Sequence, residues 1–178
     1  GYMAGTPDST AGSSELMCLT SEMSLAQWSL NNAASTPYIQ RVELGNSNAL
    51  PWMADLNHND AACSVCQSPS RSWPLSMTGR NDCPSGFMLD YSGYLMANKY
   101  SNYRSQYICV DSTAEGIQGT TADTTSATLY PVEAHGSLGS YIDARELTCA
   151  QCSSADGPTY VRWGRSTCPV TSNLIYAG

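Results

Sequence analysis

Residues 63–84 read CSVCQSPSRSWPLSMTGRNDCP, and residues 149–169 read CAQCSSADGPTYVRWGRSTCP. Each stretch begins with two cysteines separated by two residues, then carries a tryptophan, Trp73 or Trp163, and ends in Gly-Arg-x-x-Cys-Pro. Self-similarity at a long spacing indicates an internal duplication, and overlooking one leads to the wrong architecture. We therefore expect two copies of one module of about 85 to 90 residues.

The similarity continues outward from these stretches and runs across the ends of the sequence. One copy continues as Tyr-Ser-Gly-Tyr-Leu-Met-Ala at 91–97, whereas the other reaches Tyr-Ala-Gly at 176–178 and resumes with Tyr-Met-Ala at 2–4. This order is that of a circularly permuted duplication with four cysteines in each copy. The expected modules are 67–152, which is continuous, and 1–66 plus 153–178, which is split.

The permutation predicts where the two ends of the sequence lie. Gly1 and Gly178 should be close together, at the place where the other copy runs unbroken through Ser92 and Gly93. Glycine suits such a junction because it adopts turn conformations freely.

The residue types between the cysteines favour strands over helices. These segments are short and rich in Tyr, Thr, Val and Ile, and clusters of Gly, Pro, Asn or Ser separate them. We expect an all-β fold of two pseudo-symmetric, disulfide-stabilised subdomains, with strands over 103–110 and 160–163 and an exposed loop over 112–128. Residues 21–30 are a helical alternative because their apolar positions have turn spacing.

Composition limits the classes of partner. Only 13% of the 178 residues are Asp, Glu, Lys or Arg, against about 25% in an average soluble domain, and the net charge is −7. Lys99 and seven arginines cannot supply the cationic surface that a phosphate backbone requires. We expect no binding to nucleic acid. Nor do we expect membrane insertion, because every apolar run is far shorter than the 18 or so residues that span a bilayer.

Eight cysteines in a weakly charged chain predict a disulfide framework, and therefore a secreted, extracellular protein. Two Cys-x-x-Cys pairs could instead supply four thiolates to zinc, or one pair could act as a redox dithiol. The four further cysteines favour disulfides. We expect no metal and no cofactor.

A polar segment at 55–60, Asp-Leu-Asn-His-Asn-Asp, places oxygen ligands at alternate positions as calcium loops do. The pattern then fails, because its sixth position is Asp60 where glycine is needed and its twelfth is Cys66 where a glutamate is needed. A polar turn held by side-chain hydrogen bonds is the preferred interpretation.

The aromatic residues suggest a binding surface. Eleven tyrosines and four tryptophans accompany a single phenylalanine, and Tyr and Trp combine an apolar face with a polar group that suits stacking on sugar rings as well as core positions. The candidate ligand-binding residues are Trp52, Asp55, Asn57, His58, Asn59, Trp73 and Trp163.

Catalysis is not expected. His58 and His135 are the only histidines, and no nucleophile elbow, zinc-protease motif or phosphate-binding loop is present. Glu43 with Arg41, and Asp143 with Glu146, could be read as an acid and its base, but charged residues at a surface or in structural ion pairs are far commoner.

The Cys-x-x-Cys, Cys-Pro-Ser-Gly-Phe and Tyr-Ser-Gly-Tyr-Leu-Met elements, in this order, resemble the C-terminal noncollagenous domain of type IV collagen. They are closer still to the related domain of invertebrate short-chain collagens, such as those of sponges, here in permuted order. The resemblance implies an all-β pair of subdomains and the disulfides Cys83–Cys152, Cys109–Cys149, Cys66–Cys168 and Cys18–Cys63.

Two functions compete on this basis. Without a Gly-X-Y tract the chain cannot supply a collagen triple helix, which favours a lectin-like protein that binds extracellular glycans. The alternative, implied directly by the resemblance, is an extracellular matrix module that assembles with itself or with matrix proteins. Self-association into a homo-oligomer is expected in either case.

Overall fold

The computed structural model is mostly β. It describes residues 2–7, 15–20, 22, 24, 39–45, 50–67, 71–99, 101–103, 105–117, 127–136, 144–155, 157 and 169. The elements are β1 (Tyr2–Gly5), β2 (Met17–Leu19), β3 (Gln40–Leu44), the 3₁₀ helix η1 (Pro51–Leu56), β4 (Trp73–Thr78), β5 (Met88–Ala97), β6 (Ile108–Asp111), β7 (Ala127–Pro131), β8 (Glu133–Ala134), β9 (Arg145–Glu146) and β10 (Thr148–Ser154).

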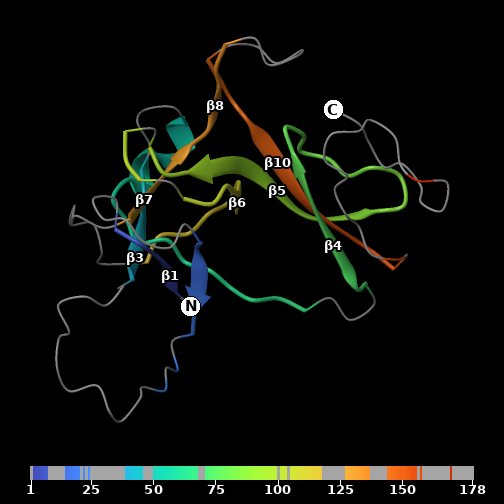
Figure 1. Cartoon of the computed structure of the whole chain (residues 1–178), viewed down its shortest axis with the longest axis horizontal. Helices are drawn as coiled ribbons and strands as arrows, with labels where there is room; N and C mark the ends of the chain where they lie inside the picture. The colour runs from blue at the N-terminus through green and yellow to red at the C-terminus, as the bar shows by residue number, and fades with distance from the viewer. Residues whose placement is uncertain are drawn as a thin grey trace.

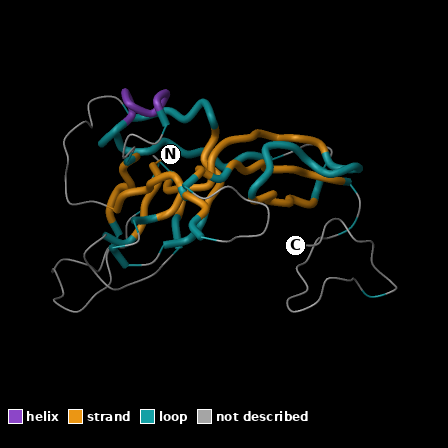
Figure 2. The backbone as a smooth tube through the Cα atoms, turned by 90° about the horizontal axis from the view of Figure 1, so that it is seen from above, coloured by secondary structure: helices purple, strands orange, loops and turns teal. Residues whose placement is uncertain are grey.

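One curled, mixed sheet of eight strands organises the described residues (Figure 1). Its strand order is β2-β1-β3-β7-β5-β10-β4, with β6 paired to β5, and β8 and β9 form a separate two-stranded sheet. β3 and β7 pair in parallel, and the other pairs between named strands are antiparallel. In Figure 2 the helix η1 lies to one side of the strands.

Two clusters of buried side chains hold the sheet together. The larger cluster lies beneath η1 and draws on both of the modules expected from the sequence: Val42, Leu44, Leu50, Met53, Ala61, Met96, Val110, Ala127 and Leu129. The smaller cluster lies on β4 and β10 and consists of Met77, Ala150 and Cys152, with Leu75, Cys83 and Phe87 packed against it. The larger cluster therefore joins segments far apart in the sequence.

Three disulfides tie the strands together, and they are three of the four pairs that the resemblance implied. Cys18–Cys63, Cys83–Cys152 and Cys109–Cys149 have Cα–Cα distances of 5.7, 5.9 and 5.7 Å. Cys149 and Cys152 are completely buried. Both cysteines of this Cys-x-x-Cys pair, and Cys63 of the other, are therefore committed to disulfides, which removes them from the zinc and dithiol alternatives.

The secondary-structure predictions are confirmed in part. The strand expected over 103–110 begins only at Ile108, and Tyr103 and Tyr107 before it are exposed. The loop expected over 112–128 is described as far as residue 117, and β7 already begins at Ala127. The strand at 160–163 and both chain ends lie outside the described residues, as does most of the helical alternative at 21–30.

No helix in the described part of the chain is long and apolar enough to cross a membrane.

Candidate functional site

The predicted polar segment follows η1 and folds into a tight turn. Pro51 begins the helix, where its fixed φ and missing N–H are tolerated. At the other end, the amide of Asn59 donates from Nδ2 to the backbone oxygen of Asp55 at 3.0 Å. This side-chain bond supports the interpretation as a polar turn.

Strand β3 supplies two charged side chains beside this turn. Arg41 donates from Nη1 to Asp60 Oδ2 at 2.8 Å, and its side chain is 55% exposed. Glu43, which is only 1% exposed, lies with its Oε2 at 3.9 Å from His58 Nδ1. The carboxylate of Asp60 therefore binds an arginine, which argues against a calcium loop in this segment. Arg41, which the sequence suggested as a partner of Glu43, is paired with Asp60.

His58 has a left-handed backbone, with φ at 64°. Its N–H donates to the oxygen of Leu44 at 2.8 Å, and the N–H of Leu44 donates to the oxygen of Asn59 at 2.9 Å. These bonds join the turn to β3 and hold the imidazole, which is 40% exposed, at the surface.

The same backbone arrangement occurs at Ala144, the other non-glycine residue of the described chain with positive φ, at 56°. Its N–H donates to the oxygen of Ala134 at 2.8 Å, as that of His58 does to Leu44. The turn can therefore be made by a residue with no functional side chain. The imidazole of His58 is an addition that the backbone does not require.

Trp52 faces the protein core more than the solvent. Its ring lies 5.7 Å from that of Tyr94 and is tilted by 33°, and it packs against the larger core cluster. Its Nε1 is buried and finds no hydrogen-bond partner among the described residues. Only part of this indole is available for stacking on a ligand.

Trp73 does not join the turn. It begins β4, which is separated from β3 in the sheet order by β7, β5 and β10, or on the order of 19 Å of strand spacing. In Figure 1, β4 lies at the right-hand end of the sheet, whereas the short teal helix η1 lies at the left, near β7. The structure thus brings Asp55, Asn57, His58 and Asn59 together beside Trp52 and places Trp73 elsewhere, and Trp163 lies outside the described residues.

A second feature, which the sequence did not suggest, is an exposed apolar end of the sheet. Trp73, Met88 and Leu89 are 40%, 63% and 49% exposed. The register places Trp73 and Leu89 on one face of the sheet, opposite Ser154 and Cys152 at the end of β10, and Met88 on the other face, opposite Ser153. A bulge between Gln151 and Cys152 interrupts the alternation there, so the sequence pattern gave no signal.

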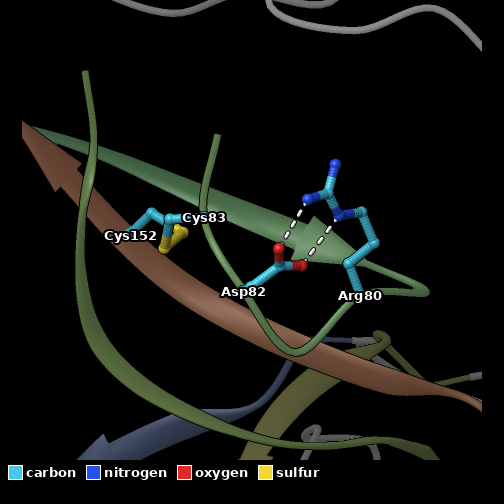
Figure 3. Close-up of polar contacts among 4 residues, drawn as sticks. All are labelled: Arg80, Asp82, Cys83 and Cys152. Atoms are coloured by element: carbon cyan, nitrogen blue, oxygen red, sulfur yellow. Dashed lines mark hydrogen bonds and ion pairs between the residues drawn. A yellow bond between two sulfur atoms is a disulfide. The ribbon is translucent and has the colours of Figure 1, made fainter. Parts of the chain in front are cut away.

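An exposed ion pair lies beside the Cys83–Cys152 disulfide (Figure 3). Arg80 donates from Nε and Nη2 to the two oxygens of Asp82 at 2.8 and 2.6 Å. These hydrogen bonds lower the pKa of the Asp82 carboxyl below its usual value. The side chains are 50% and 63% exposed, so the pair contributes little to stability.

The phenol of Tyr91 also has a shifted pKa. Burial raises its pKa above 10.0, and the nearby carboxylate of Asp111 adds to the effect. Its hydroxyl donates to the oxygen of Cys109 at 3.0 Å. Tyr91 thus helps to fasten β6 to β5, a structural role.

No group of three or more potential metal ligands is found in the part of the chain that the structure describes. Arg41 and Glu43, which complete the surface around His58, come from a strand fifteen or more residues earlier, so the sequence predicted the turn and missed these neighbours. Asp143 and Cys168 lie outside the described residues. The predicted Cys66–Cys168 bridge stays a prediction.

Comparisons with known protein families, curated proteins and solved structures found no match.

Proposed function

We propose that this chain is a noncatalytic extracellular protein that binds glycans at the surface around His58. The observation that carries the proposal is the pair of equivalent turns. Ala144 makes the same left-handed turn and the same 2.8 Å hydrogen bond as His58. The backbone of this turn therefore does not require a histidine, and the half-exposed imidazole of His58, which lies beside Glu43, can contribute to recognition.

The chemistry around His58 suits a hydroxyl-rich ligand. The guanidinium of Arg41 is a donor, the imidazole of His58 can donate or accept, and the amide of Asn57 can do both. Salt-bridged Asp60 and hydrogen-bonded Asn59 hold these groups in place. A preformed set of donors and acceptors on a rigid turn reduces the entropy lost on binding.

The test is a broad glycan array, followed by titration of the best ligand against the variant His58→Ala. We expect binding to fall about tenfold or more, which corresponds to about 1.4 kcal/mol. The unfolding midpoint is measured alongside, because this substitution also removes the imidazole that lies beside the buried Glu43 carboxylate. His135→Ala, which changes the other histidine, is the matched control and should bind as the wild type does.

The proposal fails if the array shows no ligand that free sugar can displace. It also fails if His58→Ala binds as well as the wild type.

We propose further that the chain contains two copies of one module. Matching strand registers support this proposal. Leu95 lies opposite Cys109, and Met3 lies opposite Cys18, in antiparallel pairs between a central strand and its neighbour. Each of these neighbouring strands is disulfide-bonded to the first cysteine of a Cys-x-x-Cys pair, over the same Cα–Cα distance of 5.7 Å.

Backbone hydrogen bonds match in the same way. The N–H of Leu147 donates to the oxygen of Val132, and that of Ala61 donates to the oxygen of Val42, both at 2.8 Å. Leu147 and Ala61 each stand two residues before a Cys-x-x-Cys pair. These correspondences support two modules related by duplication, the split one formed from 1–66 and 153–178.

An extracellular location is part of the proposal. Six of the seven cysteines that the structure describes form disulfides, which persist in oxidising compartments and are rare in the cytosol.

Matrix assembly is the second candidate, favoured by the exposed apolar end formed by Trp73, Met88 and Leu89. Aromatic residues and methionine are enriched in protein interfaces. The resemblance to collagen noncollagenous domains also favours this candidate, because it implies matrix assembly. Sedimentation should then show a defined oligomer that Met88→Asp dissociates, whereas a monomer at all concentrations would contradict it.

A further inference from the structure

A segment that follows β6 runs alongside the turn of His58. Asp111 ends β6, and its Oδ1 accepts hydrogen bonds from the N–H and the hydroxyl of Thr113, both at 2.8 Å. The N–H of Ala114 donates to the oxygen of Asp111 at 3.1 Å, and Ala114 packs against the larger core cluster. These contacts fix the direction in which the chain leaves β6. We call residues 111–117 the strap.

The strap pairs with the residues that follow the turn. Ala61 and Gly116 form an antiparallel bridge. The N–H of Ile117 donates to the oxygen of Asp60 at 2.9 Å. Asp60 is also the residue whose carboxylate binds Arg41. The strap therefore fixes the backbone that supports one side of the proposed glycan surface.

Gly116 of the strap lies directly against the side chain of Asn59. A Cβ built on Gly116 would stand 2.7 Å from Asn59 Cβ and 3.0 Å from both its Cγ and its Nδ2. Real Cβ atoms essentially never approach another heavy atom to less than 3.0 Å, and ordinary contact begins at 3.4 Å. Only glycine leaves room for Asn59 where the structure places it.

Asn59 in turn holds the shape of the turn. It is 9% exposed, and its Nδ2 donates to the oxygen of Asp55 at 3.0 Å. Its backbone N–H donates to the oxygen of Leu56, also at 3.0 Å. Both bonds close over Asn57 and His58, so a shift of Asn59 moves these two polar side chains.

The residue that corresponds to Asn59 in the other turn has a different setting. Ala144 makes the equivalent turn, and Arg145, which follows it, is exposed. The turn alone therefore does not bury the residue after it. The strap accounts for the burial of Asn59, because Gly116 lies against its side chain.

We propose that Gly116 is a positioning residue of the glycan surface. It allows the strap to hold Asn59, and through Asn59 the side chains of Asn57 and His58, in the geometry that binds the ligand. Polar groups held in place in advance lose less entropy on binding. The inference rests on the glycan binding proposed above, and it assigns part of that surface to a segment far away in the sequence.

The test is the variant Gly116→Ala, titrated with the best ligand from the glycan array. The added methyl group must displace Asn59 by about 0.7 Å, which is large enough to break its 3.0 Å bond to Asp55. We expect binding to weaken about threefold to tenfold, the factor that one lost hydrogen bond corresponds to. Gly157→Ala, whose Cβ meets nothing within 4 Å, is the matched control and should bind as the wild type does.

A double-variant cycle shows whether the effect passes through Asn59. Asn59→Gly removes the side chain that the new methyl group would meet. In that background, Gly116→Ala should therefore change the affinity by less than about twofold. An equal loss in both backgrounds would overturn the proposal, because Gly116→Ala would then act without Asn59. Wild-type affinity of Gly116→Ala would overturn it as well.

NMR tests the positioning without a ligand. The side-chain amide signals of Asn59 and the imidazole Cε1–H signal of His58 should shift in Gly116→Ala and stay unchanged in Gly157→Ala. If the array yields no ligand, the glycan proposal fails, and the positioning is decided by these signals: shifts at both residues support it, and unchanged signals overturn it.

Hydrogen exchange of the wild type needs no variant that could fail to fold. The amide of Ile117, which is bonded to Asp60, should exchange about tenfold or more slowly than in an unstructured peptide. Free exchange at Ile117 would refute the strap itself.

Discussion

Replacement of Gly93 by alanine should be among the most damaging single changes in this protein. Gly93 lies in the middle of β5, where β10 pairs with one edge and β6 with the other. A Cβ built on Gly93 would lie 1.8 Å from the oxygen of Val110 and 2.9 Å from the nitrogen of Ser112. Both are backbone atoms, which no side-chain rotation can move aside.

The cost can be worked out from these distances. Ordinary contacts begin at 3.4 Å, so β6 would have to move away by about 1.6 Å. That displacement breaks the hydrogen bonds around Gly93, including the one from Ser112 N–H to the oxygen of Ser92 at 3.1 Å. Two or three lost bonds at about 1 kcal/mol each, together with overpacking of about 1–3 kcal/mol, give about 3–6 kcal/mol.

The assay is urea unfolding with the disulfides intact, monitored by tryptophan fluorescence. Gly157→Ala is the matched control, because nothing lies within 4 Å of its added Cβ, and it should change the free energy of unfolding by less than about 0.5 kcal/mol. Gly86 has equally open surroundings but a φ of +87°, so Gly86→Ala should cost about 1–2 kcal/mol from backbone strain alone.

A Gly93→Ala protein as stable as Gly157→Ala would refute the close approach of β6 to β5. A loss no greater than that of Gly86→Ala would refute it as well, because the clash with β6 should cost more than the backbone strain at Gly86.

Three further predictions concern titration and cross-linking. The raised pKa of Tyr91 means that the folded state favours its neutral form. The contribution of Tyr91 to stability is therefore complete below pH 10.0 and fades as the pH rises through the folded pKa. Absorbance titration at 295 nm, comparing wild type with Tyr91→Phe, should show this phenol ionising above pH 10.0. Replacing Cys109 and Cys149 together by alanine opens a loop with a sequence separation of 40 and should cost about 4 kcal/mol by urea unfolding; a cost below about 1 kcal/mol would contradict the constraint. Because the pKa of Asp82 is lowered in the folded state, its ionised carboxylate contributes a small stabilisation above pH 3.8, and this contribution is lost as the pH falls through the folded pKa. NMR titration should place this pKa below 3.8 in wild type and at the ordinary value in Arg80→Ala.

The limits of strand prediction are clear at the start of β6. Tyrosine favours strands, and so the sequence predicted a strand from Tyr103 onward. In the fold Tyr103 and Tyr107 are 56% and 65% exposed, and β6 begins at Ile108, where the partner residues of β5 become available. The neighbouring strand decides the boundary, and a local propensity carries no information about it.

The candidate site shows the same contrast between features set by local sequence and features set by a neighbouring strand. The turn at 55–59 was predictable because the hydrogen bond from the Asn59 side chain to Asp55 joins residues only four positions apart. Arg41 and Glu43 reach it only because β3 runs alongside, as the 2.8 Å bond to Asp60 records. Trp73 was grouped with the turn on residue type alone, and the sheet order separates the two.

The sequence by itself determined the β-rich character, because residue type is a property of the chain, and the family resemblance of its motifs implied the three disulfides that the structure contains. Only the tertiary structure decided which polar groups surround His58, that Trp52 leans into the core, and that Trp73, Met88 and Leu89 are exposed at one end of the sheet. Those features depend on distances between segments dozens of residues apart, which the burial of a shared core fixes and which no local pattern encodes.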